Sequence, residues 1–324
     1  MGSSFCWANF GSASIDYSLF GAVRTVHQGF NSRRCEGLDM HYLGIDAGAS
    51  ATQWALINQS GVQISGVEAA MDGHIYRAAS KERMNEVTDR IAQQIRGFTV
   101  SGVYLGITGV LTDGSIEQLL KEKFGADATV VSDIELAYRA NFSKGQGILL
   151  YAGTGSVAYA IDTNSRVHKI GGWGYLLGDE GAGYWIGREA IRQALLTLEN
   201  QDVISDGVLT QLILNEMDAT DWNSIKEFVY SQERSAIAAL SRTVDKAAND
   251  GDMAAILILK AAAGHLVDLV NRVDGILGES LLPVKFTGGI SSSTVITSEL
   301  GKILGNRVSR STVDIAVRAA ELAR

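Results

Sequence analysis

Residues 147–162 read GILLYAGTGSVAYAID, and residues 42–57 read YLGIDAGASATQWALI. In both stretches an apolar run is followed by a short glycine-containing turn and a second apolar run. This pattern is typical of two strands joined by a tight turn. Ala47–Gly48 in the first stretch aligns with Ala152–Gly153 in the second. The chain therefore contains an internal repeat, and each copy is predicted to open a domain with a strand–turn–strand hairpin.

Outside the hairpins, apolar residues recur at strand or helix spacing. Strands mixed with helices in two halves predict an α/β protein of two domains with a cleft between them, a form suited to closing around a ligand. Further strands are predicted at Val62–Val67, Val103–Ile107, Ala128–Val131 and Val284–Phe286. Helices are predicted at Lys81–Arg96, Ile116–Phe124, from Ile134 onward, and at Arg188–Glu199, Val208–Glu216, Trp222–Val229, Ala236–Asn249, Ala254–Val273 and Val313–Ala323.

The N-terminal stretch differs from the rest of the 324-residue chain. Residues 1–39 show no strand or helix period, and the first predicted strand begins directly after Met40. We predict that residues 1–39 form a disordered extension, because such ends are poorly ordered unless they are tied down. Basic residues outnumber acids before Glu36, so an organelle-targeting peptide is the alternative.

Composition narrows the class of protein. The net charge is −8, and the absence of a long basic run argues against a nucleic-acid partner. The sequence contains no run of eighteen apolar residues, so no membrane span is expected, and we expect a cytoplasmic protein. The two cysteines are Cys6 and Cys35, which excludes a disulfide framework or a thiolate metal site in the main body.

The two glycine turns are candidate phosphate sites, because backbone N–H groups that converge in a turn attract anions. Facing each other across a cleft, the turns could hold the β- and γ-phosphates of ATP. Asp46 ends the first strand and would face Mg²⁺, through water. A plain hairpin turn is the alternative for each. The candidate nucleotide-binding residues in these turns are Asp46, Gly48, Ser50, Gly153, Thr154, Gly155 and Ser156.

A third stretch, residues 171–187, reads GGWGYLLGDEGAGYWIG. Seven of its seventeen residues are glycine, interleaved with aromatic and acidic residues. Aromatic faces, carboxylates and exposed backbone amides are means of holding a sugar ring, which makes Trp173, Tyr175 and Asp179 candidate sugar-binding residues. The alternative is a glycine-rich connector in which Asp179 or Glu180 caps a helix that begins near Ala182.

Residues 171–187 resemble the signature of the N-acetylglucosamine kinases and of the wider BadF/BadG/BcrA/BcrD-type ATPase family, in the sugar kinase, Hsp70 and actin superfamily. The resemblance covers roughly residues 42–324. It implies a two-domain actin-like ATPase fold, a duplicated ribonuclease H-like fold with a central cleft. The expected domains are 40–146 and 147–311, with 312–324 forming a helix that returns to the first domain. ATP and Mg²⁺ as cofactors, a small-molecule sugar partner and a homodimer are also implied.

The resemblance also implies roles for single residues. Asp133 matches the general base that takes the proton from the primary hydroxyl of the sugar. Thr108 and Gly109 match a loop at the sugar and hinge, and Thr154 would also contact the sugar. Thr287, Gly288 and Gly289 match the adenosine motif, where the nucleotide lies close to the backbone. From the residues alone, a helix cap at Asp133 and ordinary turns at the other positions remain open.

The chain departs from the family pattern at two places. Residues 46–52 read Asp-Ala-Gly-Ala-Ser-Ala-Thr, where the family pattern is Asp-Gly-Gly-Gly-Thr-Lys-Thr. Amino-sugar kinases carry an Asn in the loop that corresponds to Ala70–Tyr76, and this segment contains none. Asp72 or His74 is a candidate ligand contact in its place, and an ordinary loop histidine is the alternative.

Together these features predict an ATP-dependent kinase that phosphorylates the primary 6-hydroxyl of an amino sugar, such as N-acetylglucosamine or glucosamine. A non-catalytic sugar- or nucleotide-binding protein is the alternative, motivated by the altered first turn. The dehydratase activators that share the family name hold an iron–sulfur cluster through cysteines, which this chain lacks after Cys35. The zinc-bearing repressors and kinases of the same fold are excluded by the missing cysteine-rich motif.

Overall fold

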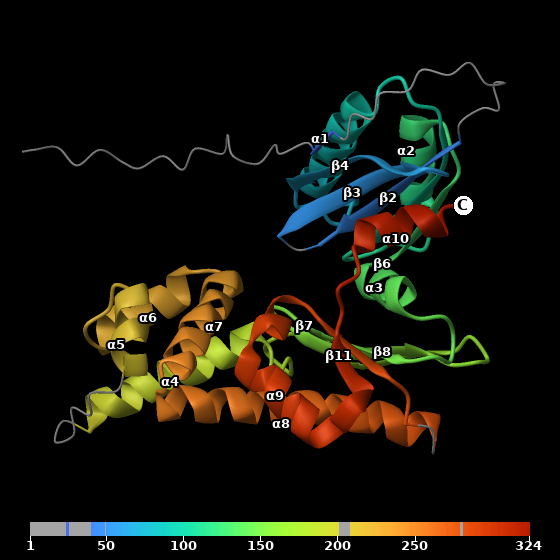
Figure 1. Ribbon diagram of the computed structural model, residues 1–324. Helices are drawn as coiled ribbons and strands as arrows, with labels where there is room; N and C mark the ends of the chain where they lie inside the picture. The colour runs from blue at the N-terminus through green and yellow to red at the C-terminus, as the bar shows by residue number, and fades with distance from the viewer. Residues whose placement is uncertain (1–23, 26–39, 49, 201–207, 279–280) are drawn as a thin grey trace, which may run out of the picture. The chain divides into compact units, whose positions relative to one another are not determined.

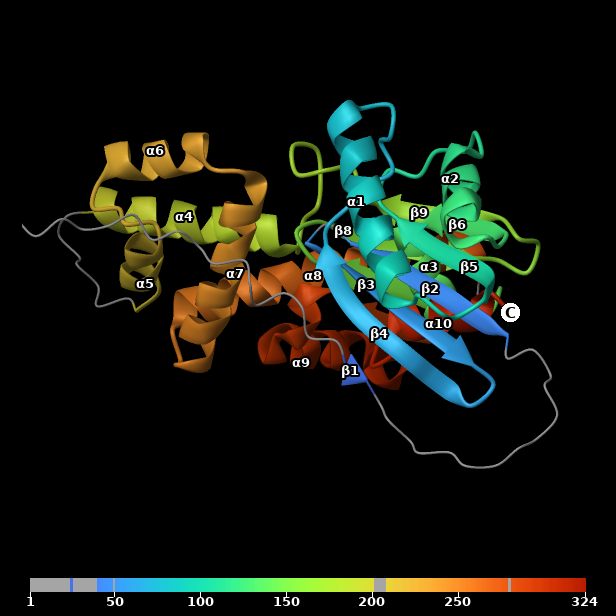
Figure 2. The same ribbon diagram turned by 90° about the horizontal axis from the view of Figure 1, so that it is seen from above.

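The computed structural model describes residues 24–25, 40–48, 50–200, 208–278 and 281–324. The chain divides into two compact units, each with its own sheet and helices (Figures 1 and 2). The first unit runs to Asp133 and includes Ala316–Arg324, and the second is Ile134–Ile315. The predicted mixed α/β class is confirmed.

The first unit contains a six-stranded sheet with the order β1-β4-β3-β2-β5-β6. Strands β2, β3 and β4 pair antiparallel, whereas β2, β5 and β6 pair parallel. The bounds are β1 Arg24–Thr25, β2 His41–Ala47, β3 Ala51–Asn58, β4 Gly61–Ala69, β5 Val100–Ile107 and β6 Ala128–Ser132.

Helices cover both faces of this sheet (Figure 1). Alternate residues of a strand point to opposite faces. Leu43 and Ile45 of β2 are fully buried in one cluster with residues of α1 (Ala78–Gln94) and α2 (Ser115–Phe124). Gly44 faces the other way, where α10 (Ile315–Leu322) lies so close that a Cβ atom at Gly44 would be 2.1 Å from the carbonyl oxygen of Ala316. A glycine at this position lets the C-terminal helix approach the sheet.

The second unit contains a five-stranded sheet with the order β11-β10-β7-β8-β9, and it is richer in helices. The strands are β7 Ile148–Ala152, β8 Ser156–Ile161, β9 Val167–Gly171, β10 Val284–Thr287 and β11 Val308–Arg310. The helices are α3 Asp133–Asn141, α4 Gly183–Glu199, α5 Val208–Glu216, α6 Trp222–Ser231, α7 Arg234–Asn249, α8 Met253–Leu277 and α9 Thr294–Leu304, with short 3₁₀ helices η2 Gly289–Ser292 and η3 Gly305–Arg307.

The internal repeat predicted from the sequence appears in the topology of the two sheets. Strand β2 pairs antiparallel with β3 and parallel with β5. Strand β7 likewise pairs antiparallel with β8 and parallel with β10. Each hairpin therefore occupies the same place in its sheet, with its turn at the carboxyl end of β2 or β7.

Of residues 1–39, the structure describes only Arg24 and Thr25. The prediction for residues 1–39 lies outside the described residues except for β1, whose Arg24 and Thr25 pair antiparallel with Ser65 and Ile64 of β4.

The predicted boundary near residue 147 marks the start of β7, whereas α3 packs Ala137 and Tyr138 into the core of the second unit. The domains 40–146, 147–311 and 312–324 remain a prediction.

Within the described residues, α8 has the length and apolar composition of a membrane-crossing helix. Its Leu259, Leu266 and Val270 are almost completely buried in the core of the second unit. It also carries charged residues, among them Arg272 and Asp274. One apolar face of α8 is thus part of this core, and a core helix passes the same test of length and composition as a membrane-crossing one.

Candidate functional site

The first glycine turn joins β2 to β3 in the first unit. Asp46 is half-buried near the end of β2, paired between Gln53 of β3 and Gly106 of β5. The amide of Gly48 donates a hydrogen bond to the carbonyl oxygen of Ala51 over 3.1 Å, which closes the turn, and Ser50 is exposed. The turn therefore places Asp46 at the carboxyl end of its strand, as predicted.

Asp46 also allows a test of whether magnesium fits this unit. Magnesium usually keeps several waters and is bound through one or two carboxylates together with substrate phosphates. In the described parts of the chain no group of three or more His, Cys, Asp or Glu side chains is placed to hold a metal ion. A single carboxylate at the end of β2 fits an ion that arrives with a nucleotide and is held through water.

The second glycine turn joins β7 to β8 in the second unit. Its Gly153 amide donates to the carbonyl oxygen of Gly155 over 2.9 Å. The first residues of α4 brace this turn from outside, because the amides of Gly183 and Tyr184 donate to the carbonyl oxygens of Gly153 (2.8 Å) and Thr154 (3.2 Å). The predicted phosphate turn is therefore attached directly to the end of the stretch 171–187.

Asp179 makes a second connection between the stretch 171–187 and this turn. The amide of Ser156 donates to Oδ1 of Asp179 over 3.3 Å, and the Ser156 hydroxyl donates to the carbonyl oxygen of Glu180 over 2.8 Å. The Asp179 carboxylate lies so close to Gly155 that a Cβ atom there would be 2.5 Å from Oδ2. Only glycine fits beside this carboxylate without displacing it.

The backbone and burial of Asp179 are unusual. Its φ is +66°, in the left-handed region that few residues other than glycine occupy. The side chain is 8% exposed, and burial raises the pKa of its carboxyl above the ordinary value, against the lowering effect of the Ser156 amide and of Arg234. Such conformations cluster at functional sites.

The helix-cap alternative for Asp179 and Glu180 is wrong. Helix α4 begins at Gly183 with Ala182 as its N-cap, and among the described residues no side chain caps it. The helix start is instead fastened by backbone bonds to the second turn. The sequence could not distinguish these cases, because an acidic residue a few positions before a helix is the ordinary cap signal.

Trp173 and Tyr175 lie in separate surroundings within the same stretch. Trp173 is 60% exposed, and the guanidinium carbon of Arg272 on α8 lies 5.3 Å from the centre of its ring. Tyr175 packs edge-to-face on Tyr184 at a centroid distance of 4.8 Å. An exposed indole face and a partly buried phenol are compatible with the predicted sugar wall, which remains a prediction.

The predicted adenosine motif follows β10 in the same unit. Gly288 has a φ of +92°, and a Cβ atom there would lie 2.3 Å from the carbonyl oxygen of Ala152. Gly289 then opens the 3₁₀ helix η2. The motif therefore touches the end of β7 just before the second turn, so the second unit brings the proposed adenosine, phosphate and sugar residues onto connected segments.

Asp133 and Thr108 are brought together in the first unit. Thr108 follows β5, and Asp133 follows the neighbouring parallel strand β6. The Thr108 hydroxyl donates to Oδ2 of Asp133 over 2.7 Å. The proposed base and the proposed sugar-loop residue therefore form one hydrogen-bonded pair, a relationship that their distance in the sequence conceals.

The segment Ala70–Tyr76 packs against Thr108 and Gly109. The Gly73 amide donates to the carbonyl oxygen of Thr108 over 2.8 Å. Gly109 has a φ of +73°, and a Cβ atom there would lie 2.4 Å from Cε1 of the His74 ring. The sequence predicted Asp72 or His74 as a ligand contact, with an ordinary loop histidine as the alternative, and no local pattern indicates that the His74 ring lies against Gly109.

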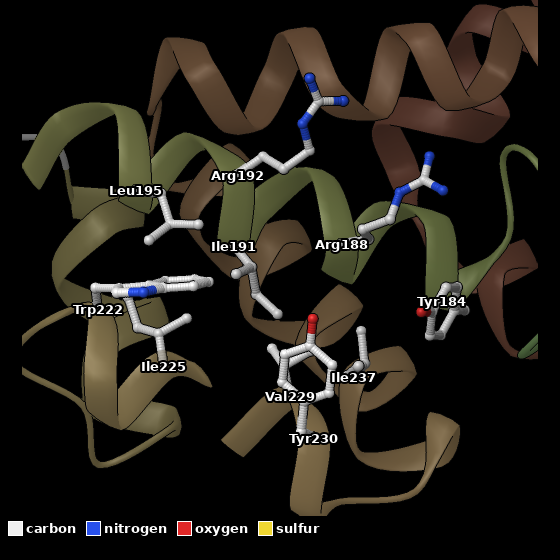
Figure 3. A pocket seen from close by; sticks show the side chains of 10 residues that line it. All are labelled: Tyr184, Arg188, Ile191, Arg192, Leu195, Trp222, Ile225, Val229, Tyr230 and Ile237. Atoms are coloured by element: carbon white, nitrogen blue, oxygen red, sulfur yellow. The ribbon is translucent and has the colours of Figure 1, made fainter. Parts of the chain in front are cut away.

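The second unit also contains a small apolar groove of about 140 Å³ among α4, α6 and α7. Figure 3 shows apolar side chains such as Ile191, Leu195 and Ile225 lining it, with Arg188 and Arg192 pointing away from them. Both arginines pair with Glu189. None of the residues predicted to bind sugar or nucleotide lines this groove.

Comparison with known proteins identifies the family. The model of the BadF/BadG/BcrA/BcrD ATPase family matches residues 43–321. The chain belongs to this family. The predicted family is thus confirmed, and membership supports the use of ATP.

Two relatives of this BadF/BadG-type ATPase are sugar kinases by name. An N-acetylmuramic acid/N-acetylglucosamine kinase from Clostridium acetobutylicum is 27% identical over 285 residues, covering 82% of this chain and 90% of the relative. An N-acetyl-D-glucosamine kinase from Dictyostelium discoideum is 27% identical over 314 residues, covering 87% and 97%. These relatives support an ATP-dependent sugar-kinase activity.

Solved structures of similar shape confirm the fold. A Chromobacterium violaceum protein described as a candidate N-acetylglucosamine kinase has a TM-score of 0.70 at 22% identity, covering 88% of this chain and 99% of that chain. A ROK family glucokinase from Streptomyces griseus has a TM-score of 0.57 at 16% identity, with coverage of 88% and 99%. The BadF/BadG-type chain therefore has the predicted actin-like ATPase fold of the sugar kinases.

Proposed function

We propose that this protein is an ATP-dependent kinase that transfers the γ-phosphoryl group to the primary 6-hydroxyl of an amino sugar, N-acetylglucosamine or glucosamine. The observation that carries the proposal is the contact of Asp179 with Gly155 and Ser156, which joins the sugar-binding stretch to the second phosphate turn. Both 27%-identical relatives act, by name, on N-acetylglucosamine. In this assignment Asp179 and Thr154 bind the sugar, and Trp173 and Tyr175 line its pocket.

The nucleotide is assigned to the two turns and the adenosine motif. Amides that converge in a turn suit phosphate oxygens. Magnesium, which would arrive with ATP and be held by Asp46 through water, offsets phosphate charge when bound. The residues assigned to the nucleotide are Asp46, Gly48, Ser50, Gly153, Thr154, Gly155, Ser156, Gly288 and Gly289.

The chemical step is assigned to Asp133. Its carboxylate takes the proton of the sugar 6-hydroxyl while that oxygen forms a bond to the γ-phosphorus. The bond from the γ-phosphorus to the bridging oxygen breaks, and ADP leaves with that oxygen. Thr108 holds the carboxylate through its 2.7 Å hydrogen bond to Oδ2, and Thr108 with Gly109 lies beside the sugar.

The alternative, a sugar- or nucleotide-binding protein without transfer activity, rests on the altered sequence of the first turn. The closing bonds do not distinguish the two turns, because the Gly48 amide donates to the carbonyl oxygen of Ala51 and the Gly153 amide donates to that of Gly155. The family pattern has glycines where this chain has Ala47 and Ala49.

A homodimer and a cytoplasmic location belong to the proposal as well, and light scattering of the purified chain tests the first of them.

A two-part experiment tests the proposal. ADP release would be measured with a panel of N-acetylglucosamine, glucosamine, N-acetylmuramic acid and glucose in the presence of ATP and Mg²⁺, and the product of a positive reaction located by NMR. We expect release with the amino sugars and phosphate on the 6-oxygen. The 6-deoxy analogue of the best sugar is the matched control, because it should raise the melting temperature without turnover.

The same assay with Asp133→Asn should show a rate lowered by about 10²–10⁴-fold with sugar binding retained. Sugar-dependent thermal shifts without ADP release in the wild-type chain would favour the binding-protein alternative. Release with no dependence on any sugar would contradict both.

A further inference from the structure

The loop between β4 and α1 contains a cluster that the proposed chemistry does not use. The carboxylate of Asp72 accepts three hydrogen bonds, from the His74 amide (2.9 Å), from His74 Nδ1 (2.8 Å) and from the Ser80 hydroxyl (3.1 Å). Burial acts to raise the pKa of Asp72, but the bonds from His74 and Ser80 outweigh it and keep the pKa below its ordinary value. Because Ser80 lies in α1, the cluster fastens the loop to that helix.

The His74 ring is fixed in place by this cluster and by its neighbour. Nδ1 faces the Asp72 carboxylate, and the ring packs edge-to-face on Tyr76 at a centroid distance of 5.8 Å. Arg77 lies over the other ring of that pair, 5.4 Å from the Tyr76 centroid. A histidine side chain that is 35% exposed would otherwise be free to change rotamer.

The fixed ring lies against the turn that carries the proposed sugar-loop residues. At Gly109 a Cβ atom would be 2.4 Å from Cε1 and 2.7 Å from Nε2 of His74, so the ring lies directly on the Gly109 backbone. Beside it, a Cβ atom at Gly73 would be 2.5 Å from the carbonyl oxygen of Gly109. With the bond from the Gly73 amide to Thr108, these contacts pack the loop and the turn together along their backbones.

The Thr108–Gly109 turn also contacts Asp133. Thr108 has its carbonyl oxygen held by Gly73 and its hydroxyl on Oδ2 of Asp133. We propose that His74, held by Asp72, is a positioning residue for phosphoryl transfer: it supports the Thr108–Gly109 turn and so holds the Thr108 hydroxyl on the Asp133 carboxylate. This inference rests on the proposed function, and it assigns His74 a role other than contact with the sugar.

Three variants of His74 separate the effect of its bond to Asp72 from the effect of its ring on Gly109. His74→Ala removes both the bond to Asp72 and the ring. His74→Asn keeps a donor near the position of Nδ1 but removes the ring from Gly109, whereas His74→Phe keeps a ring and removes the donor. We expect His74→Ala to lower kcat by about 10- to 100-fold, since small misplacements of a reacting group have effects of that size. KM for sugar and for ATP should stay within about twofold, and the Asn and Phe variants should each recover part of kcat.

A matched control comes from the second unit. His168 forms a similar pair with Asp162, with Nε2 3.0 Å from Oδ2, and it is 9% exposed. His168 lies in β9. Asp162 directly follows β8, at the end of that strand that is away from the second phosphate turn. His168→Ala should therefore lower the melting temperature without changing kcat per folded molecule, which shows what loss of a purely structural His–Asp pair does.

A double-mutant cycle with Gly109→Ala tests the contact itself. In the wild-type background the added methyl group meets the His74 ring, and His74→Ala removes the three atoms nearest to it, which all belong to that ring. The loss of kcat caused by Gly109→Ala should be smaller in the His74→Ala background, although the positive φ is strained in both. Equal losses in the two backgrounds would show that the ring does not press on the turn.

Hydrogen exchange at the Gly73 amide gives a readout that does not depend on activity. His74→Ala should speed this exchange, because the bond to the Thr108 carbonyl oxygen is loosened. Unchanged exchange and unchanged kcat would overturn the inference, and so would a rise in sugar KM with kcat unchanged, the sign of direct sugar contact. A wild-type chain that phosphorylates no sugar would defeat the proposed function, and the exchange measurement would still decide whether His74 holds the turn.

Discussion

Thr108 donates its hydroxyl hydrogen to Oδ2 of Asp133 over 2.7 Å, and this bond joins the carboxyl ends of the neighbouring strands β5 and β6. Carboxyl ends of parallel strands are the usual place for ligand-binding residues in α/β sheets. The bond orients the Asp133 carboxylate, as the proposed role of Asp133 as general base requires.

Thr108→Val keeps the shape of the side chain but removes this donor. We expect kcat for sugar phosphorylation to fall about tenfold, because a hydrogen bond to a charged group contributes about 1.5–3 kcal/mol and part of it is replaced by water. Steady-state kinetics measure the effect, and Thr108→Ser, which keeps the hydroxyl, is the control. Equal rates for the Val and Ser variants would contradict a role for the bond.

Asp179→Ala should weaken sugar binding by about ten- to a hundredfold, because sugar hydroxyls left unpaired in a closed site carry a penalty of about 1–3 kcal/mol each. ATP binding should change only through the lost contact with the Ser156 amide. Calorimetric titration of sugar and nucleotide separately measures both affinities. Intact sugar affinity with a lowered melting temperature would make Asp179 a structural brace of the second turn alone.

The stability contributed by Asp179 should depend on pH. Burial raises the pKa of Asp179, so its contribution to folding is fully present below the unfolded-state value of 3.8 and is lost as pH rises through the higher native value. Asp179→Asn keeps an acceptor for the Ser156 amide without the charge. Its melting temperature should exceed that of the wild type at pH 7, and the difference should shrink towards pH 4. A difference that is constant over this range would show that ionisation of Asp179 carries no cost.

Gly44→Ala should destabilise the first unit. The added methyl group would lie 2.1 Å from the carbonyl oxygen of Ala316 and 2.2 Å from the Ala320 nitrogen, so α10 must move away from the sheet. Overpacking of this kind costs about 1–3 kcal/mol, and urea denaturation measures it. Gly264→Ala in α8 is the matched control, because among the described residues no atom outside the adjoining helix backbone and chain neighbours lies within 4 Å of its Cβ position, and alanine favours a helix.

A chain that begins at Met40 should fold and bind ligand as the full chain does. It loses the two residues of β1 that pair with Ser65 and Ile64 at the edge of β4, while β2, β3 and the core cluster around Leu43 stay complete. Circular dichroism and a melting curve check this. A fall of several degrees in melting temperature would mean that the removed residues pack on the core.

The sequence alone predicted the elements whose patterns are local. Both hairpins were found because each has two apolar runs around a glycine turn, and α1, α2, α7 and α8 because their apolar residues repeat at helical spacing. The elements missed include β9, β11 and α9, besides the two-residue strand β1 and the short 3₁₀ helices η2 and η3. Strand β9 has His168 and Lys169 next to each other between its apolar residues, β11 has only three residues, and α9 opens with the β-branched Thr294, Val295 and Ile296, which favour strands.

The residues of the candidate site could likewise be predicted from the sequence only in part. The glycine turns and the stretch 171–187 identify Asp46 and Asp179 as residues of interest, whereas Asp133 stands out only through the family resemblance, because an acid before a helix is also the ordinary cap signal. Their roles in catalysis and binding remain predictions.

Only the tertiary structure decided which residues touch. Asp179 reaches Ser156 across 23 positions and Thr108 reaches Asp133 across 25, and the His74 ring lies on Gly109. The first contact comes from the return of the chain from β9 to α4, the second from the pairing of β5 with β6, and the third from the loop between β4 and α1. Local propensity records the geometry of a few neighbouring residues, whereas contacts between distant side chains depend on how whole elements pack, and the sequence carries no local signal for that.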